Sequence, residues 1–176
     1  MTSQIRVDSI VPTTGVPTGG GGGIVQIKSV TKTDTFTTTS SSFTDITGLS
    51  VSITPKSSSN KILIQVHVTG DGRATQSRAN FRLMRDSTAI CIGDTAGNRH
   101  RSTFAIYRPN DDQTPGAASM AHLDSPATTS AVTYKLQIIS GNGGGNTVSV
   151  NRAHYWSDDG AHAATVSSIT VMEVSA

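Results

Sequence analysis

The sequence predicts an all-β protein, an antiparallel β-sandwich or barrel, and three features of the chain support this prediction. Ser, Thr, Gly and Val are abundant, whereas glutamate occurs only at Glu173, so strong helix formers are scarce. Short segments alternate apolar and polar side chains with a period of two, as strands with one buried face do. Turn-forming residues separate these segments, and no stretch keeps a helical period over three turns.

The chain divides into an N-terminal arm, a tether and a head domain. Residues 1–18 form an extended arm, in which Pro12 and Pro17 prevent the leading strand-like phrase from continuing as a central strand. Residues 19–23 are five consecutive glycines and predict a flexible tether. Residues 24–176 form the β-sandwich head, which is long enough to bury a core alone or with copies of itself. A disordered terminus is the alternative for the arm.

Four segments of the head alternate most clearly and predict its best-defined strands: residues 49–54, 61–68, 132–139 and 147–150. Because successive side chains of a strand point to opposite faces, every second residue is expected to face the core. The expected core residues of the first three segments are Leu49, Val51, Ile53, Ile62, Ile64, Val66, Val68, Val132, Tyr134, Leu136 and Ile138.

Weaker patterns predict further strands between turn signals such as Thr54-Pro55 and Asp86-Ser87. In chain order these strands cover residues 24–31, 33–38, 79–85, 88–93, 102–107, 117–123 and 166–174. About eight to ten strands at this spacing are typical of a sandwich or barrel.

Two long loops, residues 108–116 and 151–165, are the best candidates for function, because long ordered loops in compact domains are uncommon and often functional. The second loop holds the only tryptophan of the chain. It supplies an aromatic face for stacking on a sugar and polar groups for its hydroxyls, from Asn151, Tyr155, Trp156, Asp158 and Asp159. The alternative is that Tyr155 or Trp156 plugs the end of the core, the commoner fate of a lone tryptophan.

The residues of this loop favour neither catalysis nor metal binding. No Gly-x-Ser-x-Gly elbow precedes a helix, and two adjacent carboxylates in a turn usually diverge. His154 and His162 flank Asp158 and Asp159, but this spacing fits no compact metal motif, and a solvated turn is the preferred interpretation. We therefore expect no enzyme activity, no cofactor and no metal within one chain.

Charge and targeting signals narrow the partners further. The formal net charge of +2 lacks the dense basic face that nucleic-acid binding requires. Arginines gather in the middle third of the chain. They could line a subunit interface, attract an anionic polysaccharide or form a solvated face, and the sequence leaves these three alternatives open. Cys91 is the only cysteine, and there is no signal peptide or apolar run of membrane-spanning length. We expect a protein made in a cytoplasm with no membrane span.

Three phrases of the chain resemble small β-rich virion proteins of tailed bacteriophages, notably those that infect cyanobacteria. They are SQIRVDSIVPTTGVPTGG at 3–20, SFTDITGLSVSITPKSSSNKILIQVHV at 42–68, and VNRAHYW with SSITVMEV at 150–156 and 167–174. The phrases cover about half of the chain and describe strands and turns, not a catalytic motif. Residues 70–130 carry little of the resemblance.

The resemblance implies a virion surface protein, either a tail fibre, a fibre tip or a capsid decoration, that serves in host attachment. It implies a jelly-roll or related sandwich, a homotrimer, and docking on another virion protein through the arm residues Ile5, Val7, Ile10 and Val11. Trimer closure is then expected to cover outward apolar side chains, of which Leu63, Ile139 and Met172 are candidates. Host surface polysaccharide is the expected partner of the 151–165 loop.

Overall fold

The computed structural model describes residues 23–72, 78–107, 113–141 and 146–176, and the predicted arm lies outside these ranges. Within them the chain forms strands and no helix. The strands are β1 (Ile24–Lys32), β2 (Phe36–Thr38), β3 (Thr44–Ile53), β4 (Lys61–Gly72), β5 (Ala79–Arg85), β6 (Thr88–Ile90), β7 (Phe104–Ile106), β8 (Gly116–Asp124), β9 (Val132–Ser140), β10 (Val148–Val150) and β11 (Ser167–Val174). The described residues therefore contain no helix long and apolar enough to cross a membrane.

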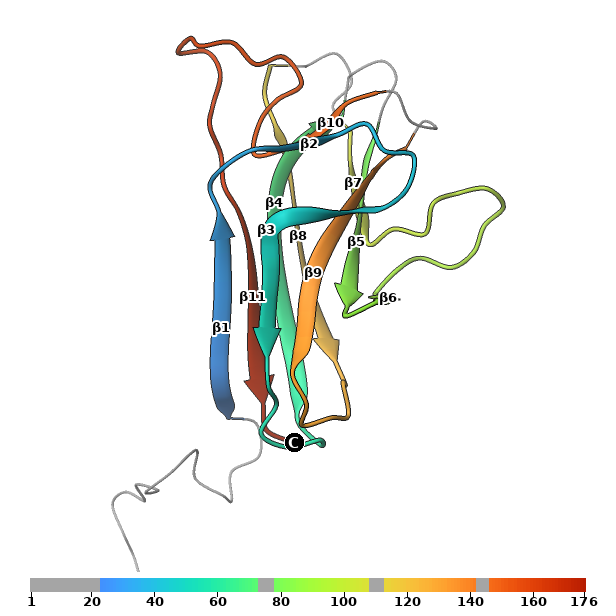
Figure 1. The fold of residues 1–176 in the computed structure, drawn as a ribbon, viewed down its shortest axis with the longest axis vertical. Helices are drawn as coiled ribbons and strands as arrows, with labels where there is room; N and C mark the ends of the chain where they lie inside the picture. The colour runs from blue at the N-terminus through green and yellow to red at the C-terminus, as the bar shows by residue number, and fades with distance from the viewer. Residues whose placement is uncertain (1–22, 73–77, 108–112, 142–145) are drawn as a thin grey trace, which may run out of the picture.

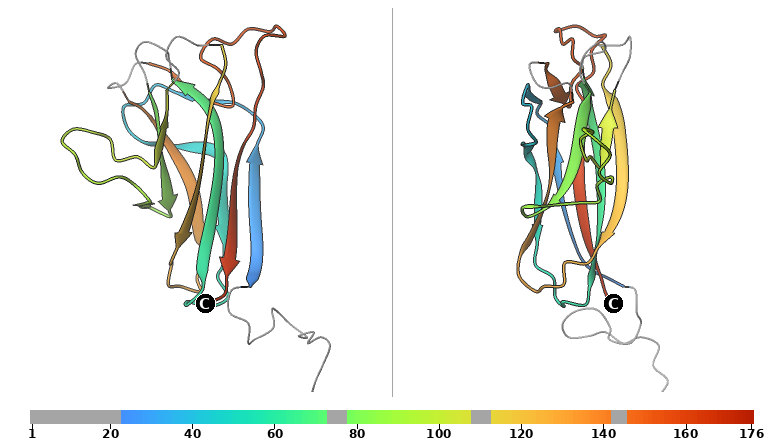
Figure 2. Two further views of the ribbon diagram at one scale, coloured as in Figure 1. Left: turned by 180° about the vertical axis from the view of Figure 1, so that it is seen from behind. Right: turned by 90° about the vertical axis from the view of Figure 1, so that its right-hand side faces the viewer.

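Two antiparallel sheets pack face to face, as the two layers in Figure 2 show. The first, which we call sheet A, has the main order β1-β11-β4-β8, and β10 and β2 extend it beside the end of β4. The second, sheet B, has the order β3-β9-β5-β6, and β7 also pairs with β5. The long strands β1, β4, β8 and β11 lie in sheet A, and β3, β5 and β9 lie in sheet B, so the chain passes repeatedly from one sheet to the other. The head is therefore a jelly-roll-like β-sandwich, as predicted.

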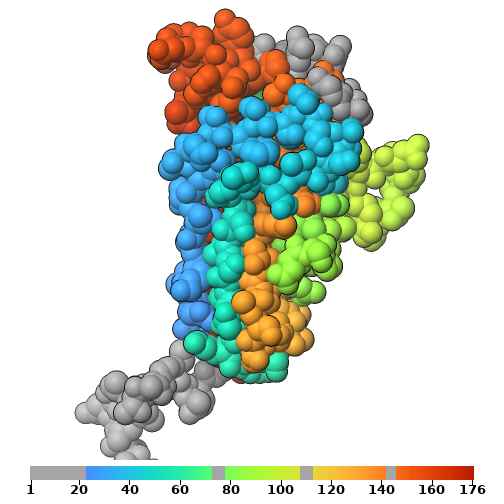
Figure 3. Space-filling model, viewed as in Figure 1, coloured from blue at the N-terminus to red at the C-terminus, as the bar shows by residue number. Residues whose placement is uncertain are grey.

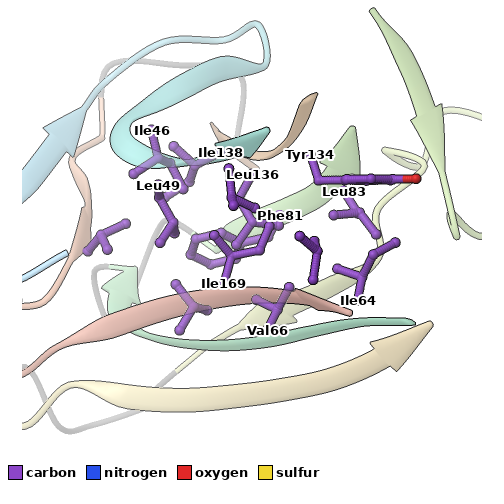
Figure 4. Close-up of a cluster of buried hydrophobic side chains, with 14 of the residues drawn as sticks. Ile46, Leu49, Ile64, Val66, Phe81, Leu83, Tyr134, Leu136, Ile138 and Ile169 are labelled. Carbon is purple, nitrogen blue, oxygen red and sulfur yellow. The ribbon is translucent and has the colours of Figure 1, made fainter. Parts of the chain in front are cut away.

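The core lies between the sheets and contains the predicted residues. Every one of the expected core side chains in β3, β4 and β9 is buried, which confirms the period-two interpretation of those segments. Figure 4 shows Phe81, Leu136 and Ile138 of sheet B facing Ile169 and Val66 of sheet A. Apolar burial of this kind contributes about 25 cal/mol per Å² and is the main favourable term of folding.

The strands differ from prediction where the backbone turns. β3 begins at Thr44 rather than at residue 49, because Gly48 adopts a φ of 82° that accommodates an irregularity in the pairing with β9. β6 ends at Ile90, since Cys91 has a φ of 51° and turns the chain away from β5. β2 and β7 are likewise shorter than predicted, with three residues each.

β4 changes neighbours along its length, and Gly70 lies at the change. Residues up to His67 pair with β11, whereas residues from Gly70 pair with β10. A Cβ atom at Gly70 would lie 2.2 Å from the backbone oxygen of Ser149, closer than any real contact. Only glycine therefore lets β10 approach β4 at this point.

The sandwich has two distinct ends, which we call the base and the apex. At the base, β1 begins beside the end of β11, and the Ser175 amide donates to the Gly23 carbonyl over 2.9 Å. The 151–165 loop lies at the opposite end, the apex, where it projects beyond the sheets (Figures 1 and 3). The point where the arm joins the head and the candidate functional loop are thus separated by the length of the sandwich.

The base is held together by Glu173, whose side chain is fully buried. Its carboxylate accepts hydrogen bonds from the Gln26 side chain, the Asn60 side chain and the Lys56 amide, at 2.6, 2.6 and 2.7 Å. Burial raises the pKa of Glu173, but these hydrogen bonds together with one from the Ser57 amide outweigh it, so the pKa lies below its ordinary value. One carboxylate therefore joins β1, β11 and the turn before β4.

Candidate functional site

The 151–165 loop is fastened to the head at its first residue, Asn151. The Asn151 side-chain amide donates to the carbonyls of Lys32 and Asp34, each over 2.8 Å. Its side-chain oxygen accepts from the hydroxyls of Thr69, at 3.2 Å, and Ser167, at 2.6 Å. The prediction that Asn151 binds sugar hydroxyls is wrong, because this side chain is buried and its hydrogen-bonding groups are already occupied within the head.

A second attachment holds the next turn of the loop. The His154 amide donates to the carboxylate of Asp71, over 3.0 Å, and the Ser149 hydroxyl donates to the Arg152 carbonyl, over 2.9 Å. Asp71 and Ser149 belong to the paired ends of β4 and β10. The paired ends of β4 and β10 therefore fix the position of the first residues of the loop.

Both aromatic side chains of the loop lie at the surface. Tyr155 is 54% exposed and Trp156 is 37% exposed, so neither plugs the core. The Arg152 guanidinium lies 5.5 Å from the centre of the Trp156 ring, a distance at which a cation–π contact is favourable. The His162 ring lies 5.5 Å from that of Tyr155. Each exposed ring thus has a side chain of the same loop against it, which restricts its orientation.

The acidic turn is organised by Asp159. Its carboxylate accepts hydrogen bonds from the Ser157 hydroxyl, from the Ala161 amide at 2.9 Å and from Nδ1 of His162 at 2.7 Å. These contacts, that of Ser157 first, lower the pKa of Asp159 to about 2. Asp158 makes none of these contacts and is exposed beside them. The two predicted carboxylates therefore differ in their contacts, since Asp159 holds the loop through its hydrogen bonds and Asp158 takes no part in them.

The serine, histidine and aspartate of this turn do not form a catalytic triad. Ser157 and Asp159 both approach Nδ1 of His162, at 3.2 and 2.7 Å. A triad needs the nucleophile on one ring nitrogen and the orienting carboxylate on the other. Over the described ranges, no three His, Cys, Asp or Glu side chains gather as a metal site either. The arrangement presents two exposed aromatic rings beside hydrogen-bonding groups.

Two residues that support the rings, Arg152 and His162, were not predicted in this role, and His162 was considered only as a metal ligand. Arg152 is held by its own loop, since its guanidinium donates to the carbonyls of Ala153 and His154 at 3.1 and 3.3 Å. In an irregular loop the spacing between a supporting residue and its ring follows no period, so the sequence carried no signal for either contact.

The predicted interface residues separate into two groups. Leu63 and Met172 are direct neighbours in sheet A and lie half-buried on its outer face. The expectation that Ile139 is left on an outward face is wrong, because this side chain is 2% exposed within a single subunit. The arm residues Ile5, Val7, Ile10 and Val11 lie outside the described residues.

No protein-family model matches the chain, and no curated protein matches it at a significant level.

Proposed function

We propose that the chain is a structural protein of a bacteriophage virion, a homotrimeric surface appendage anchored by its arm. The observation that carries the proposal is the polarity of the head: Gly23, the first described residue, lies at the base, and the exposed aromatic loop lies at the apex. A short extended arm can add a strand to the edge of a host sheet. Three arms on one trimer would add avidity to weak individual docking. Such a molecule suits a tail fibre, a fibre tip or a capsid decoration.

Deletion of residues 2–17 tests the anchoring role of the arm. The head buries its own core, so we expect the deleted protein to fold with an unchanged circular dichroism spectrum and melting temperature. We expect it to be absent from purified particles, whereas the full chain is present in them. Normal incorporation of the deleted protein would refute arm docking, and absence of the full chain from every particle fraction would refute the virion assignment.

A second candidate function is recognition of host surface polysaccharide by the apex loop. Tyr155 and Trp156 are exposed and supported from within the loop, and Asp158 lies exposed nearby to accept hydroxyl protons. Aromatic rings held in one orientation lose little entropy when a ligand stacks on them. This function is compatible with the first, since the tip of a fibre both assembles and binds.

Binding of Trp156→Ala and Tyr155→Ala to a glycan array and to host cells tests the second function. We expect each substitution to weaken binding about tenfold, or about 1.4 kcal/mol, because one stacking surface is lost. Tyr107→Ala is the matched control: Tyr107 is also an exposed ring with an arginine, Arg78, above it at 4.8 Å, but it lies outside the loop. Unchanged binding by both folded loop variants would remove this site.

A further inference from the structure

The outer face of sheet A contains three complete cross-strand rows of four residues each. The strand register of β1, β11, β4 and β8 places one residue of each strand in every row. The rows are Ile27, Met172, Leu63 and Leu123; Ser29, Thr170, Gln65 and Ala121; and Thr31, Ser168, His67 and Ser119. We call this surface the row face.

The twelve residues of the row face include no Asp, Glu, Lys or Arg. One charged side chain borders them on the same face, that of Lys61, which lies two residues before Leu63 on β4 and donates to the Ser125 hydroxyl over 2.7 Å. The outer face of sheet B differs, since Asp45, Lys135 and Arg82 lie on it and Lys135 pairs with Asp45 at 2.6 Å. A strand face that stays in water usually carries charged side chains, and depletion of charge is the signature of an interface core. The two outer faces of one sandwich therefore have different chemistry.

The row nearest the base is entirely apolar and crosses all four strands. Its two outermost members, Ile27 and Leu123, are 54% and 55% exposed. Single exposed apolar residues need no explanation, but a continuous row of four on a flat sheet is an apolar patch that favours contact with another protein.

The polar groups of the other rows partly satisfy one another. The hydroxyls of Ser29 and Thr170 are 2.8 Å apart, and Nδ1 of His67 lies 2.9 Å from the Ser119 hydroxyl. Burial of a polar group costs little when it keeps a hydrogen-bond partner. These pairs lower the free-energy cost of removing the row face from water.

We propose that a second copy of this chain packs on the row face, an inference that takes its stoichiometry from the proposed homotrimer. An uncharged face offers nothing to a charged partner, whereas in a closed trimer the uncharged face of each copy can be covered by a different surface of the next copy. Four strands about 4.8 Å apart and three rows about 6.7 Å apart cover on the order of 400 Å², about half of the ~800 Å² per partner of a standard interface, so neighbouring residues of the sheet would also take part. A single extended segment such as the arm is one strand wide and would leave most of the rows in water.

Sedimentation velocity of the full chain and of Leu123→Lys tests this proposal. We expect the full chain to associate at micromolar concentration, and we expect Leu123→Lys to raise the half-association concentration at least about a hundredfold, because it buries an unpaired charge. Ile27→Lys, at the other end of the row, is the second variant should the first fail to fold. Ser52→Lys is the matched control on an exposed position of β3 in sheet B, and it should associate like the full chain.

Three results would overturn the proposal: a monomeric full chain, folded lysine variants that associate normally, or loss of association on replacing Ile5, Val7, Ile10 and Val11 with serine. The last result would show that the arm holds the copies together. Incorporation into particles is a separate readout. A row-face variant that is monomeric supports the interface whatever its fate in the virion, and an associating protein that never enters particles contradicts only the virion assignment.

Discussion

The base and the apex of the head are each organised around one buried polar side chain, Glu173 and Asn151, but the two differ in charge. Glu173 is an anion that accepts hydrogen bonds from three segments of the chain. Asn151 is neutral and both donates and accepts, so that it joins the ends of β1, β4, β10 and β11. The same structural task is thus solved with and without a charge, and only one solution depends on pH.

The comparison also shows where the molecule tolerates change. Beyond Asn151, most contacts of the apex loop join residues within the loop itself, as with Asp159 and His162. The partners of Glu173 lie more than a hundred residues away along the chain. Loss of a loop contact therefore affects the loop, whereas loss of either buried side chain affects the whole fold.

Asn151→Ala should have the largest effect of the changes considered. It leaves two carbonyls and two hydroxyls without their partner and places alanine at a φ of 62°, so we expect a loss of about 4 kcal/mol in the free energy of unfolding. Urea denaturation at pH 7 and pH 4 should give the same difference from wild type, because no charge is involved.

Asn151→Gly is the matched control, since glycine accepts this backbone conformation without strain. We expect it to be about 1 kcal/mol less destabilising than alanine. A loss below about 1 kcal/mol for Asn151→Ala would mean that the hydrogen bonds at the apex do not hold the strand ends.

Glu173→Gln should have the next largest effect, a loss of about 2 kcal/mol in the free energy of unfolding at pH 7. The substituted amide brings an N–H group toward donors that now point at a carboxylate, and the charge-assisted hydrogen bonds are lost. Denaturation by urea measures this loss, and Asp94→Asn, at an exposed carboxylate, serves as the comparison.

The loss caused by Glu173→Gln should depend on pH in one direction. The folded pKa of Glu173 lies below the ordinary value of 4.5, so its stabilisation is complete above that pH and is lost as the pH falls through the folded pKa. The difference between wild type and Glu173→Gln should therefore shrink in acid. A constant difference from pH 7 to pH 3 would contradict the role of the charge.

Asp159 should show the smallest effect, confined to the loop. The hydrogen bonds from Ser157 and His162 favour the anion, so its side chain should titrate near pH 2, and the loop contacts should persist until the pH falls to that value. The amide resonance of Ala161 reports the titration by NMR. Ser157→Ala should move the midpoint upward toward 3.8, and a wild-type midpoint already at 3.8 would refute the local network.

The strands could be predicted because each long strand has one wet and one buried face, as Ile62 to Val68 show. Strand order could not, since pairing such as that of β4 with β8 and β11 joins segments of similar pattern far apart in sequence. Ile139 was misassigned because alternation assumes an uncovered outer face, and the chain buries this position itself.

The candidate site was only partly predictable. Residue type and loop length identified Tyr155 and Trp156 as surface candidates, and the structure exposes both. Asn151 has the same composition signal as a sugar-binding residue, but its φ of 62° and its buried partners depend on the three-dimensional fold. The row face was also hidden, because its rows appear only once the register of four strands is known.

Gly70 has a consequence for how this head can diversify. Core positions of β4 such as Ile64 could carry another apolar side chain of similar size, whereas a Cβ atom at position 70 collides with the Ser149 carbonyl. Saturation mutagenesis of position 70, screened for folded protein, should recover only glycine. Insertions or substitutions that change the loops of the apex must therefore leave Gly70 in place.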